Sequence, residues 1–155
     1  MLNNKYRVLI GRNYLVNLID NKLKMPNKII LTTSESRQII NMGGPYIGNL
    51  LLNNKQIAKD CLADNYIYVE QTQKIYFVRY HDTTGMMNGV FFTINFYSIK
   101  EDKIFEYEKR FKYLYIKQIV ENKLEIYHAF HDQIAKYKAL FDLSNEQYNS
   151  VSPDL

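Results

Sequence analysis

The chain has 155 residues, 46% of them hydrophobic, and a formal net charge of +4. This length suits a single domain spanning residues 1–155, and the apolar content is sufficient for a real core. No apolar run approaches the roughly 20 residues of a membrane-spanning helix, and the N-terminus lacks the apolar stretch of a signal peptide. We therefore expect a cytoplasmic protein without a membrane partner.

The apolar residues are of a kind that favours strands. The chain contains 14 Tyr and 8 Phe but no Trp, and aromatic residues suit the pleated, half-buried surface of a sheet. The single cysteine, Cys61, excludes an internal disulfide and a cysteine zinc site, which agrees with a reducing compartment. The predicted fold class is mainly β.

The positive charge is concentrated at one end. Residues 1–40 carry seven basic and two acidic side chains, so the rest of the chain is close to neutral. This balance fits an acidic partner surface, or a solvated strand face whose lysines prevent edge-to-edge aggregation.

The first half of the chain predicts short strands separated by polar turns. The turns are the TTSES segment at 32–36, the Gly43-Gly44-Pro45 corner and Asn53-Asn54. No Gly-Lys-Ser/Thr follows the glycines, so they indicate a tight turn and not a phosphate-binding loop. The predicted strands are residues 6–10, 14–19, 28–32 and 46–52.

Residues 65–80 predict the β-hairpin around which the rest of the chain is arranged. Side chains alternate between two faces on either side of a polar turn at 71–73. A loop at 83–89 then precedes the continuous apolar run 90–99, which favours a strand covered on both faces. We expect this strand at the sheet centre, with Phe92, Ile94 and Phe96 in the core.

An antiparallel meander is expected to continue to about residue 130, through strands at 104–109, 111–119 and 124–130. Beyond it the apolar period changes from two to about 3.6, which predicts one C-terminal helix over residues 132–143, followed by a short tail at 144–155. An Asn precedes an apolar strand at residues 27, 65 and 122, which is a weak internal repeat. Because propeller blades repeat along the sequence, a blade-like arrangement resembling part of a propeller is an alternative.

The three histidines are the candidates for chemistry. His128 and His131 lie close in sequence, and His81 could join them only through the fold. In a strand, however, His128 shares a face with Ile126, whereas His131 falls past the strand end. We therefore expect no catalytic residue, no metal and no cofactor, and keep a small histidine enzyme as an alternative.

The tyrosines indicate a recognition surface. So many hydroxyl groups are difficult to satisfy inside a small core, and Tyr is enriched where proteins bind proteins. The hairpin and the adjacent loop therefore supply the predicted partner-binding residues: Tyr66, Tyr68, Arg79, Met86 and Met87. The competing interpretation places the two tyrosines in the core.

The strand rhythm of residues 43–130, from GGPYIGNLLLNNKQI through KIYFVRY to KLEIYHAF, resembles that of small β-rich bacterial immunity proteins. The resemblance implies a non-enzymatic inhibitor that occludes a cognate toxin encoded by a neighbouring gene, and it assigns no functional residue. A nucleic-acid or accessory binding module is the alternative, although the sequence contains no known RNA- or DNA-binding motif and +4 is a modest charge for that role. Nucleic acid is therefore an unlikely partner.

Overall fold

In the computed structural model, residues 8–10, 15–19, 26–39, 44–83 and 89–152 are described. Most of these residues are in strands, as the aromatic and β-branched composition predicts. The strands in chain order are β1 (Val8–Ile10), β2 (Leu15–Ile19), β3 (Pro26–Gln38), β4 (Tyr46–Leu52), β5 (Lys55–Val69), β6 (Lys74–Asp82), β7 (Val90–Ser98), β8 (Lys103–Phe111), β9 (Tyr115–Val120), β10 (Lys123–Tyr127), β11 (Lys138–Asp142) and β12 (Tyr148–Val151).

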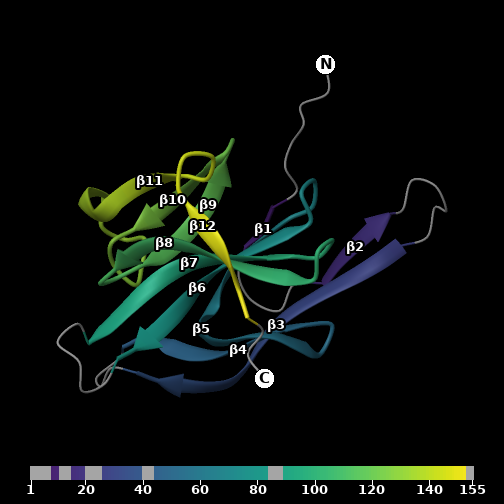
Figure 1. The fold of residues 1–155 in the computed structure, drawn as a ribbon, viewed down its shortest axis with the longest axis horizontal. Helices are drawn as coiled ribbons and strands as arrows, with labels where there is room; N and C mark the ends of the chain where they lie inside the picture. The colour runs from purple at the N-terminus through teal and green to yellow at the C-terminus, as the bar shows by residue number, and fades with distance from the viewer. Residues whose placement is uncertain (1–7, 11–14, 20–25, 40–43, 84–88, 153–155) are drawn as a thin grey trace.

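The strands form two antiparallel sheets (Figure 1). The large sheet has the order β12-β8-β7-β6-β5-β4-β3-β2, with β1 also paired to β5. The small sheet has the order β11-β10-β9. Most neighbours in the sheets are also neighbours in the sequence, which confirms the predicted antiparallel meander. The described strands do not divide into separate four-stranded blades, so the propeller-like interpretation is not supported.

Strand β5 is long and bent, and it joins the two halves of the large sheet, β12-β8-β7-β6 on one side and β4-β3-β2 on the other. Its first half pairs with β4 and its second half with β6, and Cys61 has a partner on both sides, Gly48 and Arg79. The pairing register shifts within this strand, and Asp60 and Asp64 both have positive φ, at 53° and 55°. Such bulges increase the local bend of a strand and re-aim the residues that follow.

The bend produces two cores, one on each face of β6 and β7. One core collects residues of β3, β4, β5, β6, β7 and β8, including Leu31, Tyr66 and Phe77. The other lies between the large and small sheets, which Figure 1 shows beside each other. Strand β7 supplies both cores, because Phe92, Ile94 and Phe96 face the second and Tyr97 faces the first. This double burial confirms that β7 is covered on both faces and that its three predicted core residues are buried. In the sheet order β7 is an interior strand, third from the β12 edge and not at the centre.

The two sheets are also joined by one side chain. Asn65 on β5 donates from Nδ2 to the carbonyl oxygen of Ile116 at 2.9 Å, and its Oδ1 accepts the N–H of Ile116 at 3.0 Å. Ile116 lies on β9, an edge strand of the small sheet. The amide of Asn65 therefore occupies the hydrogen-bonding position that a neighbouring strand would fill, which satisfies buried backbone groups.

The predicted helix over residues 132–143 is wrong. The described residues contain one short 3-10 turn, Ala135–Tyr137, followed by β11, and no α-helix. The expected apolar stripe does not exist, since Ile134 and Leu140 are 41% and 59% exposed while Phe141 is buried. Strand β11 instead pairs along β10, which fixes a period of two. Within the described residues no helix is long and apolar enough to cross a membrane.

The predicted turn at residues 32–36 is also wrong, because this polar segment lies inside β3. The pairing of β3 with β4 shifts register between Ser34 and Arg37. The polar residues thus form an irregular place in a strand, which a turn-rich composition does not distinguish from a true turn.

Candidate functional site

Both tyrosines that were predicted to contact a partner are buried. Tyr66 and Tyr68 are 1% and 0% exposed, and the Tyr66 hydroxyl donates to the carbonyl oxygen of Leu31 at 2.9 Å. Burial, with the charge of Glu70, raises the pKa of Tyr68 to about 12. The prediction that these two residues form an exposed face is therefore wrong. They lie in a core together with side chains of β3 and β4, the half of the large sheet that folds over them.

The other predicted contact residues have different outcomes. Arg79 is half-buried on β6, whereas Met86 and Met87 lie outside the described residues. The ends of their loop are described, and Thr83 donates from both N–H and Oγ1 to the carbonyl oxygen of Gly89, at 3.2 and 2.5 Å. The two ends of the loop are thus held together.

His81 belongs to a polar cluster that runs across β6, β7 and β8. Its Nε2 lies 2.9 Å from Thr93 Oγ1 and 3.0 Å from Glu106 Oε2, and Thr93 Oγ1 donates to the same oxygen at 3.0 Å. Asn95 Nδ2 donates to Thr93 Oγ1 at 2.9 Å. Strand pairing thus brings the carboxylate of Glu106 to His81 from 25 residues further along the chain.

This cluster does not have the geometry of a nucleophilic triad. A base histidine uses one ring nitrogen for the nucleophile and the other for the carboxylate, whereas Nε2 of His81 contacts both Thr93 and Glu106. Thr93 is also buried. Burial alone would raise the pKa of Glu106, but hydrogen bonds from His81 and Thr93 hold that pKa below its ordinary value. The cluster stabilises the sheet face.

His128 and His131 come together in a different place, on the wall of an open cavity of about 580 Å³. Tyr137 and Pro45 lie on the same wall. Among the described residues, no group of three or more His, Cys, Asp or Glu side chains is arranged to hold a metal ion. Both histidine side chains are exposed at this wall.

A second cavity of about 260 Å³ adjoins this one, and both share Tyr113 and Phe130. It lies at the ends of β6 and β7, where Tyr80, Val90 and Phe92 form its walls. We call the two adjoining cavities the aromatic groove, defined by Tyr80, Val90, Tyr113, His128, Phe130 and Tyr137. Its walls come from the large sheet, from the link between β8 and β9, and from the segment after β10.

Comparisons with protein-family models, with curated proteins and with solved structures found no match to this chain. Function is therefore inferred from the geometry of the chain itself.

The groove tyrosines each carry a basic side chain over the ring. The Cζ of Arg37 lies 6.0 Å from the ring centre of Tyr80, and the Nζ of Lys112 lies 5.4 Å from that of Tyr113. At the far end, Lys136 Nζ lies 5.1 Å from the ring centre of Tyr137. Cations at this distance are attracted to the negative face of the ring. The groove is thus apolar in its walls and basic at its rim.

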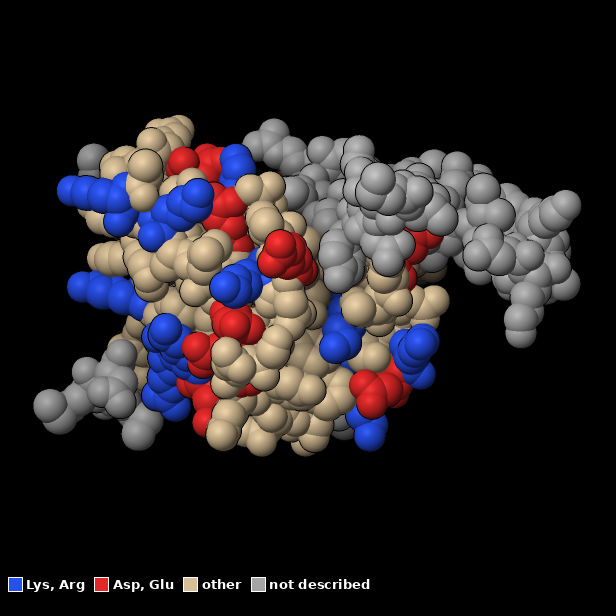
Figure 2. Space-filling model, turned by 90° about the horizontal axis from the view of Figure 1, so that it is seen from above, with Lys and Arg blue, Asp and Glu red and all other residues tan. Residues whose placement is uncertain are grey.

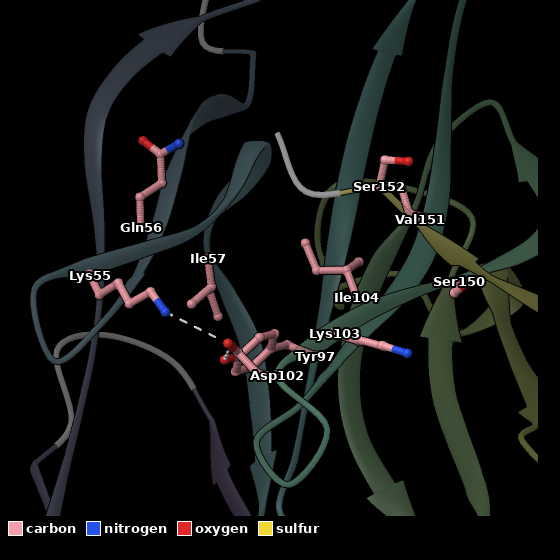
Figure 3. Close-up of a pocket in the computed structure, with 10 residues that line it drawn as sticks. All are labelled: Lys55, Gln56, Ile57, Tyr97, Asp102, Lys103, Ile104, Ser150, Val151 and Ser152. Atoms are coloured by element: carbon pink, nitrogen blue, oxygen red, sulfur yellow. Dashed lines mark hydrogen bonds and ion pairs between the residues drawn. The ribbon is translucent and has the colours of Figure 1, made fainter. Parts of the chain in front are cut away.

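Another pocket, of about 400 Å³, opens where the β4–β5 hairpin meets β8 and β12 (Figure 3). Lys55 on one side points toward Asp102, with Nζ and Oδ1 3.8 Å apart, and Tyr97 donates to the same carboxylate. Both charged side chains are well exposed, so this ion pair contributes little to stability. The pocket therefore lies where the β4–β5 hairpin approaches the β12 edge of the same sheet.

Surface charge gives no single area of one sign on the face drawn in Figure 2, where basic and acidic side chains are interleaved.

The groove is not predictable from the spacing of residues in the sequence, because its walls come from residues between 39 and 137 that only the fold brings together. One sequence feature does mark it. Tyr113 follows Lys112 in a short segment between two strands, so an exposed aromatic residue was to be expected there.

Proposed function

We propose that this chain is a non-enzymatic protein-binding protein and that a partner protein docks in the aromatic groove. The observation that carries the proposal is an open concavity lined by large apolar side chains. Tyr113 and Val90 are 42% and 43% exposed there, next to the partly buried Phe130. Exposed apolar surface that is concave and rimmed by polar groups is typical of interaction sites.

The packing of the groove suits an anchor from a partner. Tyr113 contacts Phe130 edge-on, with ring centres 5.5 Å apart and an interplanar angle of 90°, and Phe130 packs in the same way on Phe92. This chain of rings connects the groove to the core, so its floor is fixed before binding. Interfaces concentrate their binding energy on such pre-formed aromatic pockets.

The finer proposal concerns the class of partner. We propose an immunity-type role, in which the chain neutralises a bacterial toxin encoded by a neighbouring gene. This identity is supported by the resemblance in strand rhythm over residues 43–130 and by the contact geometry of the groove. Occlusion of a toxin requires a shaped recognition surface and no chemistry of its own.

The test is a binding measurement between the chain and the product of the adjacent reading frame, by titration calorimetry. Tyr113→Ala should weaken binding by about 2 kcal/mol, or roughly 30-fold, because it removes the ring shared by both cavities. Tyr148→Ala is the control for loss of an exposed tyrosine ring, since Tyr148 is 45% exposed and lies on β12 outside the groove. Melting temperatures of both variants are compared, because the Tyr148 ring also packs on Phe96 and Phe105.

Two results would contradict the proposal in different ways. If the neighbouring gene product does not bind the wild-type chain, the proposed partner is wrong. If it binds and Tyr148→Ala weakens the complex while Tyr113→Ala does not, the binding site lies elsewhere on the protein.

A further inference from the structure

The lining of the aromatic groove is free of acidic side chains. Among the described residues, no aspartate or glutamate lies on the wall of either cavity, whereas Lys112, His128 and His131 do. The acidic residue that is nearest in sequence to these lining residues is Asp132, next to His131. Its carboxylate accepts a hydrogen bond from Lys117, so its negative charge is compensated. The wall of the groove therefore carries the ammonium group of Lys112 with no carboxylate among the described lining residues.

The basic side chains at the groove differ in what they already contact. Arg37 lies 3.5 Å from Asp60 and is thus partly compensated. Lys112 and Lys136 form no ion pair with any described residue, and each lies only over a tyrosine ring. An ammonium group held in place over a ring, with no carboxylate partner, is available to a partner's carboxylate.

The Tyr80 end carries acidic side chains as well as the basic Arg37. Burial, then the charge and hydrogen bond of Asp82, raises the pKa of Tyr80, and Asp60 adds to the effect. Two carboxylates therefore lie beside this end, outside the cavity walls. A bound partner with negative charge along its whole length would be repelled by these carboxylates. A partner segment with an apolar residue at this end would not be.

We infer that the aromatic groove binds an acidic segment of a partner protein, whose apolar side chain seats against Tyr113 and Phe130 while its carboxylates meet Lys112 and Lys136. This inference rests on the proposed function and names the chemistry of the partner at the same site. Electrostatic complementarity of this kind sets specificity and the association rate more than the total affinity.

Single-stranded nucleic acid is the competing occupant, because tyrosines with basic residues also bind bases. Two features disfavour it. One face of the Tyr113 ring and one face of the Tyr137 ring already lie under a lysine. At the Tyr80 end the carboxylates of Asp60 and Asp82 outnumber the one basic side chain described there, Arg37, and so oppose a phosphate backbone.

The experiment uses the full-length chain and a displayed library of random dodecapeptides as the probe. Peptides are selected on the wild-type chain and on the double variant Lys112→Glu/Lys136→Glu. The matched control is Lys100→Glu/Lys123→Glu, which changes net charge equally, in a turn and at the start of β10, at residues that line neither cavity. Circular dichroism and melting temperature establish that each variant folds. If the reversed variant does not fold, Lys112→Gln/Lys136→Gln replaces it.

We expect the wild-type chain and the control to enrich peptides in which Asp or Glu flanks an aromatic or aliphatic residue. The groove variant should bind these peptides at least about 10-fold more weakly in low salt, and the control within about 2-fold. Enrichment of neutral or basic peptides, no enrichment, or equal binding by the groove variant would overturn the inference. Tighter binding of a 12-nucleotide oligouridine than of the best peptide would overturn it in favour of nucleic acid.

The same variants separate this inference from the proposed function. If the neighbouring gene product binds the wild-type and the groove variant equally, the acidic-segment inference is wrong and the protein-binding function stands. If that product does not bind the wild-type chain at all, the proposed partner is wrong, whatever peptides the groove selects.

Discussion

Tyr66 and Tyr68 are two residues apart on one face of β5, but their hydroxyl groups have different surroundings. The Tyr66 hydroxyl donates to the Leu31 carbonyl, whereas the buried Tyr68 hydroxyl has no hydrogen-bond partner among the described residues. Among the described residues Tyr68 is the one tyrosine with a buried hydroxyl group that lacks a partner. The expectation that a small core leaves many hydroxyl groups unsatisfied, and so keeps Tyr66 and Tyr68 on the surface, is therefore wrong.

Replacement by phenylalanine should distinguish the two sites. Tyr66→Phe should lower the free energy of unfolding by about 1 kcal/mol, because a buried hydrogen bond is lost. Tyr68→Phe should leave it unchanged or raise it, because a buried hydroxyl without a partner is removed. Urea unfolding of both variants measures this difference. Equal destabilisation would show that the Tyr68 hydroxyl is hydrogen-bonded in solution.

Asn65 predicts a larger effect. Asn65→Ala removes both hydrogen bonds to Ile116 and leaves a buried N–H and a buried carbonyl without partners. We expect a loss of roughly 2–4 kcal/mol in the free energy of unfolding. The control is Asn122→Ala, since Asn122 is an exposed turn residue whose side-chain amide donates to Ser144, and its backbone bond to Leu143 is kept in the variant. A loss below about 1 kcal/mol for Asn65→Ala would mean that the two sheets pack without this contact.

Among the elements, β5 depends on two aspartates in a conformation that most residues avoid. Asp64 has φ of 55° and its side chain is exposed. Asp64→Gly should therefore be neutral or stabilise the protein by up to about 1 kcal/mol, whereas Asp64→Val should cost about 1–2 kcal/mol, because a β-branched residue is strained at positive φ. Thermal melting of the two variants tests the bend directly. Equal melting temperatures would show that β5 straightens in solution.

The cluster on β6, β7 and β8 predicts a dependence on pH. The pKa of Glu106 lies below its ordinary 4.5 in the folded chain, so its contribution to stability is present above that pH and is lost as pH falls through the lowered value. Glu106→Gln should therefore be less stable than the wild type at pH 7. The difference should shrink as pH falls below the lowered pKa of Glu106, as measured by urea unfolding. If the difference in unfolding free energy does not change with pH, the charge of Glu106 does not contribute to stability.

Strand β11 shows why the C-terminal element was predicted wrongly. Its sequence, KALFD, contains strong helix formers, and its apolar residues also fit a helical period when Ile134 and Tyr137 are included. A run of five residues does not distinguish the two periods. Pairing with β10 over five residues decides the outcome, and pairing partners distant in sequence are invisible to local propensity.

At the scale of the whole molecule, the parts that could be predicted are those set by neighbours in sequence. The hairpin of β5 and β6, the turn at Asn53-Asn54 and the buried run of β7 follow from alternation and turn residues. The fold-over of the large sheet and the aromatic groove do not, because both bring together residues far apart in the chain. The predicted partner-binding residues instead included Tyr66 and Tyr68, which the fold buries, and Arg79, which lines neither cavity of the groove.

The shared strand β5 has a consequence for how the molecule comes apart. Each core contains side chains from β5, since Tyr66 and Tyr68 face one and Ile67 and Val69 face the other. Neither core can open without disturbing the same backbone, so the domain should unfold as one cooperative unit. Its edges, β2 and β12, are then the places where partial opening begins, and the amide hydrogens of β5 should be among the last to exchange with solvent.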